Sequence, residues 1–164
     1  MVITDLTVRD LDSFYNCFAQ LMKEGYGQFP ANLSKFFLDH DYTKVNFSLW
    51  LERNFRKFLI CKDDSGQVVG FLVGDHTYGG VGFISWLGML PELRDQGWGG
   101  KMLALYESYA KSKGAHLLEL YTHNKARDFY LKHGFHEIGR REEGLFGQLN
   151  VIMDKKIGDW SFNA

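Results

Sequence analysis

Residues 94–101 decide the fold, and they read Arg94-Asp95-Gln96-Gly97-Trp98-Gly99-Gly100-Lys101. An apolar run over residues 83–90 precedes this stretch and an amphipathic run over residues 102–110 follows it, which predicts a strand, a glycine-rich turn and a helix. The first amide N–H groups of a helix have no acceptor within the helix and lie at the positive end of its dipole, so they bind anions. Glycines in the turn let the backbone approach such a ligand closely. The stretch therefore predicts a pyrophosphate-binding turn.

The glycine spacing excludes two common phosphate-binding motifs. A Walker-type loop requires Gly at position 95 and Ser or Thr at position 102, where this chain has Asp95 and Met102. A dinucleotide-binding fingerprint requires a third Gly at the position of Met102. What remains is the pattern R-x-x-G-x-G from Arg94 to Gly99. The plain alternative is a helix that merely begins with flexible glycines.

A second informative segment, residues 124–135, reads NKARDFYLKHGF. Asn124 suits the N-cap of a helix. Three apolar residues share one face of that helix, at i, i+3 and i+4: Ala126, Phe129 and Tyr130. Gly134 then provides a left-handed stop, and Phe135 begins the next strand. The segment predicts a short amphipathic helix followed by a strand.

The two segments together resemble a known family. The patterns R-x-x-G-x-G at residues 94–99 and N-x-x-A-x-x-x-Y-x-x-x-G-F at residues 124–135 resemble motifs A and B of the GNAT N-acetyltransferases, in order and with a strand-sized gap between them. The resemblance implies an enzyme that uses acetyl-CoA as cosubstrate and transfers its acetyl group to a primary amine, directly and within a ternary complex. The alternatives are a non-catalytic acyl-CoA-binding sensor or partner module, and an enzyme that uses another acyl-CoA.

Hydrophobic periodicity supports the same fold along nearly the whole chain. Strands are expected at residues 3–8, 58–62, 67–74, 81–90, 116–122, 136–141 and 148–155. Helices are expected from Asp10 or Asp12 to about Lys23, near residues 32–40, 43–56 and 97–113, and in the second motif. We expect an α/β (α+β) fold with a GNAT-like mixed, mostly antiparallel sheet of six to seven strands and about four helices. Residues 1–164 are expected to form one domain.

Composition narrows the class of protein. With 45% hydrophobic and 24% charged residues, the chain is typical of a soluble globular domain. A formal net charge of -1 without a Lys/Arg run gives no support for nucleic-acid binding. No apolar stretch approaches the roughly 18 residues that cross a bilayer, and no leader opens the chain, so we expect a cytoplasmic protein without a membrane partner. Cys17 and Cys61 are expected to be buried free thiols.

The resemblance assigns residues to the coenzyme. The backbone of the strand before the turn would pair with the pantetheine arm, through Leu87, Gly88 and Met89. The pyrophosphate would be bound by the amides of Gln96, Gly97, Trp98, Gly99, Gly100 and Lys101. Arg94 and Lys101 would add positive charge, and Asn124 would bind the pantetheine or a nearby water. Lys125 and Arg127 are placed to reach the 3′-phosphate, with an ordinary solvated role as the alternative.

Acetyl transfer to an amine makes three chemical demands. The amine must lose a proton, because an alkylammonium with a pKa of about 10 has no lone pair to attack with. The developing oxyanion needs a hydrogen-bond donor, for which we expect the backbone N–H of Met89. The departing thiolate needs a proton, and the resemblance assigns that role to Tyr130.

The general base is open at this stage. Many relatives place a Glu on the strand at residues 81–90, but here Ser85 and Trp86 occupy its middle and it carries no carboxylate. The candidates are His123, then His76 and Asp75, then Glu24; direct attack without a dedicated base is the alternative. His123 leads because an unperturbed imidazole titrates near pH 6.5.

The acceptor and the assembly state are also open. The candidate acceptors are an amine-bearing small molecule, an amino acid, a polyamine and a protein or peptide lysine. Three acidic residues weakly favour a cationic acceptor: Glu24, Asp39 and Asp41. The loop at residues 26–29 is expected to admit it. We expect no metal, because His133 and His136 flank a helix-ending Gly134 and no Cys accompanies them. Homodimers are common in the family, so a dimer is one expected assembly.

Overall fold

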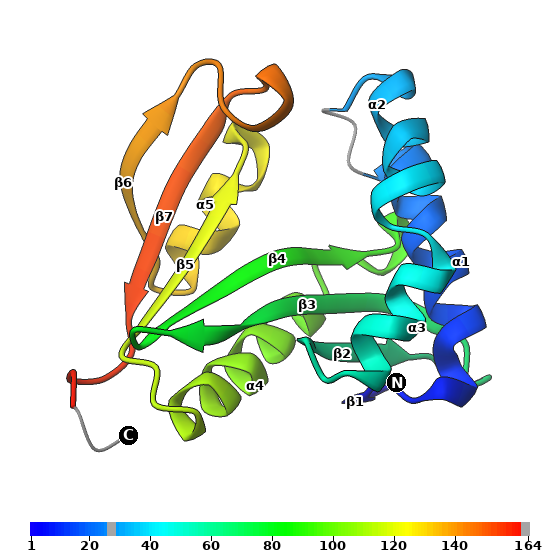
Figure 1. Cartoon of the computed structure of the whole chain (residues 1–164), viewed down its shortest axis with the longest axis horizontal. Coiled ribbons are helices and arrows are strands. Elements are labelled where there is room, and N and C mark those ends of the chain that lie inside the picture. The colour runs from blue at the N-terminus through cyan, green and yellow to red at the C-terminus, as the bar shows by residue number, and fades with distance from the viewer. Residues whose placement is uncertain (26–28, 162–164) are drawn as a thin grey trace. The chain divides into compact units, whose positions relative to one another are not determined.

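The computed structural model describes residues 1–25 and 29–161, and in this part it contains seven strands and five α-helices (Figure 1). The strands are β1 (Val2–Asp5), β2 (Arg56–Lys62), β3 (Val68–Tyr78), β4 (Val81–Met89), β5 (Leu117–Thr122), β6 (His136–Arg141) and β7 (Asn150–Lys156). The helices are α1 (Leu11–Gln20), α2 (Ala31–Phe36), α3 (Lys44–Glu52), α4 (Trp98–Ser112) and α5 (Asn124–Lys132). No helix within residues 1–25 and 29–161 is long and apolar enough to cross a membrane.

The strands form one mixed sheet in the order β1-β2-β3-β4-β5-β7-β6. β4 and β5 are parallel, whereas β1 with β2, β5 with β7 and β6 with β7 are antiparallel. Parallel neighbours require a crossover connection, and α4 supplies it between β4 and β5. The expected sheet is thus confirmed.

The parallel ladder between β4 and β5 is short. It pairs Val81 with Leu117 and ends with Ile84 opposite Leu120. β4 nevertheless continues to Met89, and β5 remains paired with β7 as far as Thr122. Residues 85–89 therefore lie beyond the last pair of this ladder.

The chain divides into two compact units. The first comprises Met1–Gly74 with Trp86–Ala104, and the second comprises Asp75–Ser85 with Leu105–Ala164. Two strands, β3 and β4, and the helix α4 contribute residues to both units.

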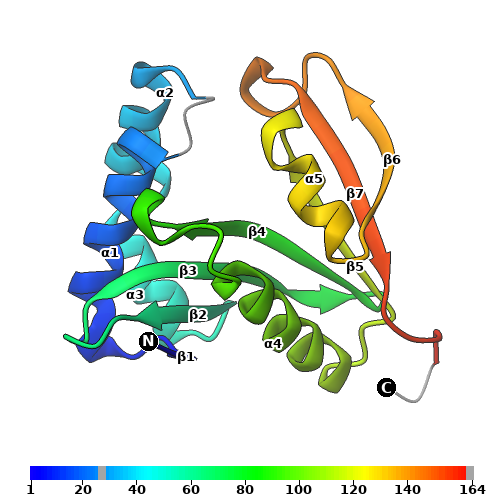
Figure 2. The same ribbon diagram turned by 180° about the vertical axis from the view of Figure 1, so that it is seen from behind.

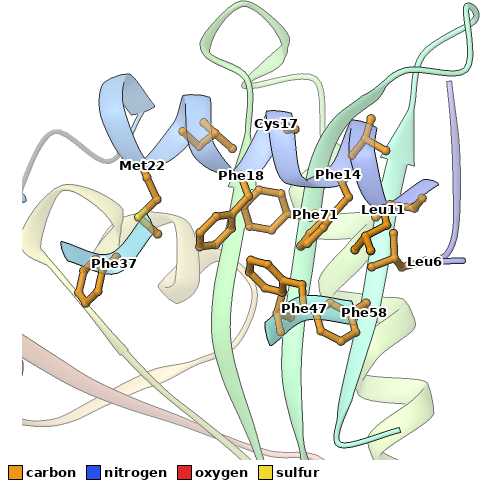
Figure 3. Packing of buried hydrophobic residues seen from close by; sticks show 14 residues of the cluster. Leu6, Leu11, Phe14, Cys17, Phe18, Met22, Phe37, Phe47, Phe58 and Phe71 are labelled. Atoms are coloured by element: carbon orange, nitrogen blue, oxygen red, sulfur yellow. The ribbon is translucent and has the colours of Figure 1, made fainter. Parts of the chain in front are cut away.

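The core of the first unit is a cluster of aromatic rings (Figure 3). Phe14 and Phe18 project from the apolar stripe of α1 toward Phe71 on β3 and Phe47 on α3. The Phe14 ring centroid lies 4.9 Å from that of Phe47 and 5.4 Å from that of Phe71, both edge-on. Edge-to-face pairs at such distances are favourable beyond the burial of their area. The cluster also includes Cys17, which together with Cys61 is a buried free thiol, as expected.

The second unit has its own core beneath α5. Leu118 and Leu120 on β5 and Val151 and Met153 on β7 are buried. Alternate residues of a strand share a face, so these four side chains lie on one face of the sheet. Figure 2 shows α5 lying over β5 and β7 on this side of the unit.

Glycines end the two helices that flank β5. Gly114 and Gly134 have φ values of 84° and 83°, a left-handed conformation that favours glycine. After α5, the N–H of Phe135 donates to the carbonyl of Tyr130 at 3.1 Å, and that of Gly134 donates to Leu131 at 3.1 Å. These are the two bonds of a Schellman motif, so the predicted stop at Gly134 is confirmed.

Two expected boundaries are corrected. The first strand ends at Asp5 rather than at Val8, because Asp10 N–H bonds the Thr7 carbonyl and closes a 3-10 turn at Val8–Asp10. The region before β2 holds two separate helices, as expected, and the Thr43 side chain caps α3 by accepting from Asn46 N–H at 3.1 Å. α3 ends at Glu52 rather than near residue 56, because Asn54 turns left-handed with φ 51°.

Phe14→Ala should destabilise the fold by about 3–5 kcal/mol, because four neighbouring rings would face a cavity that they cannot fill. The measurement is the free energy of unfolding in urea. Val45→Ala on α3 is the matched control: that side chain is 68% exposed and its loss should change the free energy by less than about 0.5 kcal/mol. Equal losses in the two variants would contradict the assignment of this core.

Candidate active site

The glycine-rich turn before α4 has an unusual backbone. A 3-10 turn at Pro91–Leu93 leads into it, and both Asp95 and Gly97 adopt positive φ values, 59° and 81°. Asp is one of the few residues other than Gly that tolerate this region. No heavy atom lies within 4 Å of the position that a Cβ on Gly97 would occupy. The turn is therefore open at Gly97.

The N-terminus of α4 presents amides to this opening. The first residue of the helix is Trp98, and the N–H of Lys101 donates to the carbonyl of Gly97 at 3.1 Å. The amides of residues 98–100 precede this bond and have no acceptor one helical turn back. The ammonium of Lys101 lies 3.9 Å from the centroid of the Trp98 ring, which adds positive charge to the same end. The arrangement is suited to a phosphate group.

Arg94 connects the turn to the end of β4. Its Nε donates to the carbonyl of Met89 at 3.1 Å. Met89 itself is 7% exposed, and a Cβ on Gly70 of β3 would overlap its Sδ and lie 2.9 Å from the carbonyl oxygen of Gly88. The N–H of Leu90 donates to the carbonyl of Val69 at 2.9 Å. This end of β4 is thus held closely against β3.

In the second unit, Tyr130 lies near the end of α5 and is 8% exposed. Its ring contacts those of Phe129 and Phe135, with centroids at 5.1 and 5.6 Å. No hydrogen bond of its hydroxyl is found within residues 1–25 and 29–161. Burial raises the pKa of the phenol well above its usual value of 10. The hydroxyl is therefore protonated at neutral pH and is a proton donor.

His123 occupies the N-cap position of α5. Its extended backbone, with φ -121° and ψ 166°, places its carbonyl to accept from the amides of Ala126 and Arg127 at 3.1 and 3.2 Å. Burial, with a smaller contribution from the nearby charge of Lys125, lowers the pKa of the imidazole below 6.5. A neutral imidazole is a proton acceptor. The expectation that Asn124 is the N-cap is wrong by one position, because the helical backbone already begins at Asn124.

Asn124 instead takes part in a polar network between α5 and β6. Its Oδ1 accepts from Arg140 at 3.1 Å. Glu137 accepts from Arg140 and from Arg127, both at 2.5 Å. Hydrogen bonds from Arg140 and Arg127 lower the pKa of Glu137 to about 2. Arg127, expected near the 3′-phosphate, is thus ion-paired with Glu137, and it also bonds Asp128.

A carboxylate lies beside the middle of β4, although β4 itself carries none. Ser85 donates its hydroxyl hydrogen bond to Oδ2 of Asp75 on β3 at 2.8 Å. The buried Tyr106 hydroxyl lies 3.0 Å from the carbonyl of Asp75 and 3.0 Å from that of Phe83. The neighbouring strand thereby supplies an acidic group at this level of the sheet.

Residues 18–135 of the chain match the acetyltransferase (GNAT) family. The chain belongs to this family. It is 31% identical over 140 residues to an aminoalkylphosphonate N-acetyltransferase of Salmonella typhimurium, covering 79% of this chain and 80% of that relative. It is 30% identical over 92 residues to the uncharacterized N-acetyltransferase YhfO of Bacillus subtilis, covering 51% of this chain and 62% of the relative.

Solved structures share the GNAT fold along nearly the whole chain. The PaiA N-acetyltransferase of Thermoplasma acidophilum, in complex with coenzyme A, superposes with a TM-score of 0.79 at 23% identity, covering 95% of this chain and 99% of that one. A phosphinothricin acetyltransferase of Sinorhizobium meliloti, in complex with AcCoA, gives a TM-score of 0.78 at 14% identity, covering 98% and 90%. At these identities the likeness establishes the fold.

Family membership confirms the expected enzyme class. The protein is an acetyl-CoA-dependent GNAT N-acetyltransferase, and acetyl-CoA is its cosubstrate. Among residues 1–25 and 29–161 no cluster of three or more His, Cys, Asp or Glu is arranged to hold a metal ion.

The two GNAT motifs fall in different units. The turn at residues 94–101 and the segment Leu87, Gly88 and Met89 belong to the first unit, and His123, Asn124 and Tyr130 belong to the second. Within the second unit, the fold joins Asn124 and Arg127 through the carboxylate of Glu137 and the guanidinium of Arg140.

The other base candidates belong to different elements of the fold. Glu24 is exposed, on the π-helical turn Leu21–Gly25. Residues 26–28 of the expected acceptor loop and the side chain of His76 lie outside the described part of the chain. Sequence reasoning missed the bond between Ser85 and Asp75 and the role of Arg140. Both depend on which residues of neighbouring strands stand side by side, for which the chain carries no local pattern.

Gly99→Val should lower the affinity for coenzyme A by about 100-fold or more, because a branched side chain in the first turn of α4 blocks a diphosphate from the amides. Titration calorimetry with coenzyme A measures it, with the thermal midpoint as a check on folding. Gly139→Val on β6, where a new Cβ would meet no heavy atom within 4 Å, should keep the wild-type affinity. Unchanged affinity in Gly99→Val would rule out this turn as the pyrophosphate site.

Proposed function

We propose that this chain transfers the acetyl group of acetyl-CoA directly to a primary amine of a small molecule, within a ternary complex. The observation that carries the proposal is the Tyr130 phenol. It is buried, its raised pKa keeps it protonated, and no group within residues 1–25 and 29–161 hydrogen-bonds it. Within those residues its hydroxyl thus lacks a protein hydrogen-bond partner, and it is not among the side-chain oxygens that are shut off from solvent. A departing thiolate would supply the partner.

Acetyl-CoA binding is assigned to both motifs. The amides from Gln96 to Gly100 take the pyrophosphate, assisted by the charges of Arg94 and Lys101. The backbone of Leu87, Gly88 and Met89 pairs with the pantetheine arm, as an extra strand pairs with a sheet edge. This role is supported by the end of the β4–β5 ladder at Ile84, before that segment begins. Asn124 bonds the pantetheine, and Arg127 contributes to the 3′-phosphate.

The transfer then proceeds by addition and elimination. The nitrogen lone pair of the neutral amine attacks the thioester carbonyl carbon, and the N–C bond forms as the carbonyl electrons move to oxygen. The backbone N–H of Met89 hydrogen-bonds this oxyanion. When the carbonyl re-forms, the C–S bond breaks, and the thiolate takes the hydroxyl proton of Tyr130. The products are an N-acetylated amine and free coenzyme A.

His123 is our choice for the group that accepts the amine proton, directly or through a water. Its position at the start of α5 and its lowered pKa support this role, since the imidazole is neutral when an ammonium must be deprotonated. Asp75 and Glu24 are the alternatives. Asp75, held by Ser85, is the better placed of the two for binding an ammonium.

The acceptor is inferred to be an amine-bearing small molecule rather than a protein lysine. One relative, aligned with this chain over four-fifths of the relative's length, is named aminoalkylphosphonate N-acetyltransferase. Aminoalkylphosphonates are therefore the first acceptors to assay. We also infer that residues 1–164 act as one catalytic domain, because β3, β4 and α4 each contribute to both units.

Tyr130→Phe should lower kcat by about 100-fold or more while the dissociation constant for coenzyme A changes by less than about two-fold, since only the proton donor is removed. Detection of the released coenzyme A with a thiol reagent gives kcat, and calorimetry gives the dissociation constant for coenzyme A. Tyr109→Phe on α4 is the control and should retain activity. If Tyr130→Phe loses stability but keeps its specific activity, the tyrosine is structural and the proposed chemistry fails.

Activity should fall on the acid side with an apparent pKa below 6.5, because burial lowers the pKa of His123 and protonation removes its lone pair. Above that pH the imidazole is neutral and kcat/KM should be level until another group titrates. The pH profile of kcat/KM measures this limb. His123→Ala should lose the acid limb of the profile together with most of the activity, whereas His136→Ala should keep both. A profile unchanged in His123→Ala would transfer the role to another group.

A further inference from the structure

Two consecutive arginines at the end of β6 have different surroundings. Arg140 bonds Glu137 and Asn124. Arg141 is exposed, and its guanidinium carbon lies 5.5 Å from the centroid of the Tyr121 ring. Within residues 1–25 and 29–161 this guanidinium makes no hydrogen bond or ion pair. Arg141 is therefore a cation held over an aromatic ring.

The strand register places the two arginines on opposite faces of the sheet. Glu137 stands opposite Met153 and Arg140 opposite Val151, and both polar residues bond side chains of α5. That face is therefore the helix-covered one. Arg141, opposite Asn150, belongs to the other face, because successive residues of a strand alternate.

The face that carries Arg141 also has two packed aromatic rings, Tyr121 and Phe83, and the carboxylate of Asp75. Tyr121 packs edge-on against Phe83 of β4, with ring centroids 5.2 Å apart. Ser85 is two residues further along β4 and shares this face, where its hydroxyl bonds Asp75. The Phe83 and Tyr121 rings thus share one face with the carboxylate beside β4 and the guanidinium over Tyr121.

Two further carboxylates face the same side. Glu119 stands opposite Phe83 on one side and opposite Asp154 on the other. Asp154 is four residues along β7 from Asn150, the partner of Arg141, a separation of about 13 Å. Asp154 is therefore well separated from the guanidinium, whereas Glu119 lies beside Phe83.

We infer that this face of the second unit binds the acceptor, and that the acceptor is a primary amine that also carries an oxyanion group, a phosphonate or a carboxylate. The inference rests on the proposed function. Arg141 binds the oxyanion through its planar fork of N–H donors, which matches two oxygens at once. Asp75 binds the ammonium, and Phe83 and Tyr121 contact a short alkyl chain between the two groups. Arg141 is a specificity residue rather than a participant in acetyl transfer.

The test compares three amines of similar length under saturating acetyl-CoA: 2-aminoethylphosphonate, β-alanine and propylamine. The full-length wild-type enzyme should prefer an anionic amine, and the preferred one identifies the oxyanion. Arg141→Gln should lower kcat/KM for that amine on the order of 10- to 100-fold, chiefly through KM, and change propylamine by less than about three-fold. For the preferred amine, kcat/KM of Arg141→Lys should fall between the values of the wild type and Arg141→Gln. Lysine keeps the positive charge but lacks the planar pair of N–H donors.

Lys113→Gln is the matched control, because the Lys113 ammonium also lies over a tyrosine, 5.8 Å from the Tyr109 centroid, on α4. It should behave as wild type with all three amines. Calorimetric titration of the preferred amine into the complex with coenzyme A should show the same loss in Arg141→Gln, independently of turnover.

The outcomes separate the two proposals. If the wild type acetylates propylamine as well as the anionic amines, or if Arg141→Gln lowers all three alike, the acceptor assignment is overturned while N-acetylation stands. If the wild type binds coenzyme A but acetylates none of the amines, and none binds to that complex, both proposals fail.

Discussion

The parallel pairing of β4 with β5 is the constraint on which the rest of this structure depends. Two parallel neighbours cannot be joined by a tight turn, so the chain must leave the sheet, form α4 and return. The connection necessarily creates a turn from strand to helix, and the N-terminus of that helix carries amides without intrahelical partners. In this chain the turn contains left-handed Asp95 and Gly97. A requirement of sheet topology thereby creates the helix N-terminus to which we assign the pyrophosphate.

Burial shifts the pKa values of Tyr130, on α5, and of His123, at its N-cap, in opposite directions. It raises the pKa of the Tyr130 phenol and lowers that of the His123 imidazole. Removal from water disfavours the charged form of either group, so both are neutral near pH 7. A neutral phenol is an acid and a neutral imidazole is a base. The helix α5 and its N-cap residue therefore carry a neutral phenol and a neutral imidazole chiefly because both side chains are buried.

The arginines of the second unit differ in their ion pairs. Glu137 holds Arg127 and Arg140 on the face that α5 covers, whereas Arg141 lies on the opposite face over Tyr121. The difference arises from a single step along β6, since alternation reverses the face at each residue. Arg140 is thus bonded to Glu137 and Asn124, whereas the exposed Arg141 guanidinium can meet an anionic ligand.

Local patterns in the sequence determined the elements and the family. Hydrophobic periodicity predicted the helix α1, and the glycines at 97 and 134 predicted the start of α4 and the end of α5, because periodicity and left-handed turns act over a few residues. Only the tertiary structure decided which strands are neighbours and in what register. The bond between Ser85 and Asp75 and the placement of Arg141 over Tyr121 join residues 10 and 20 positions apart. Such contacts depend on the packing of the whole sheet, which no short stretch of chain encodes.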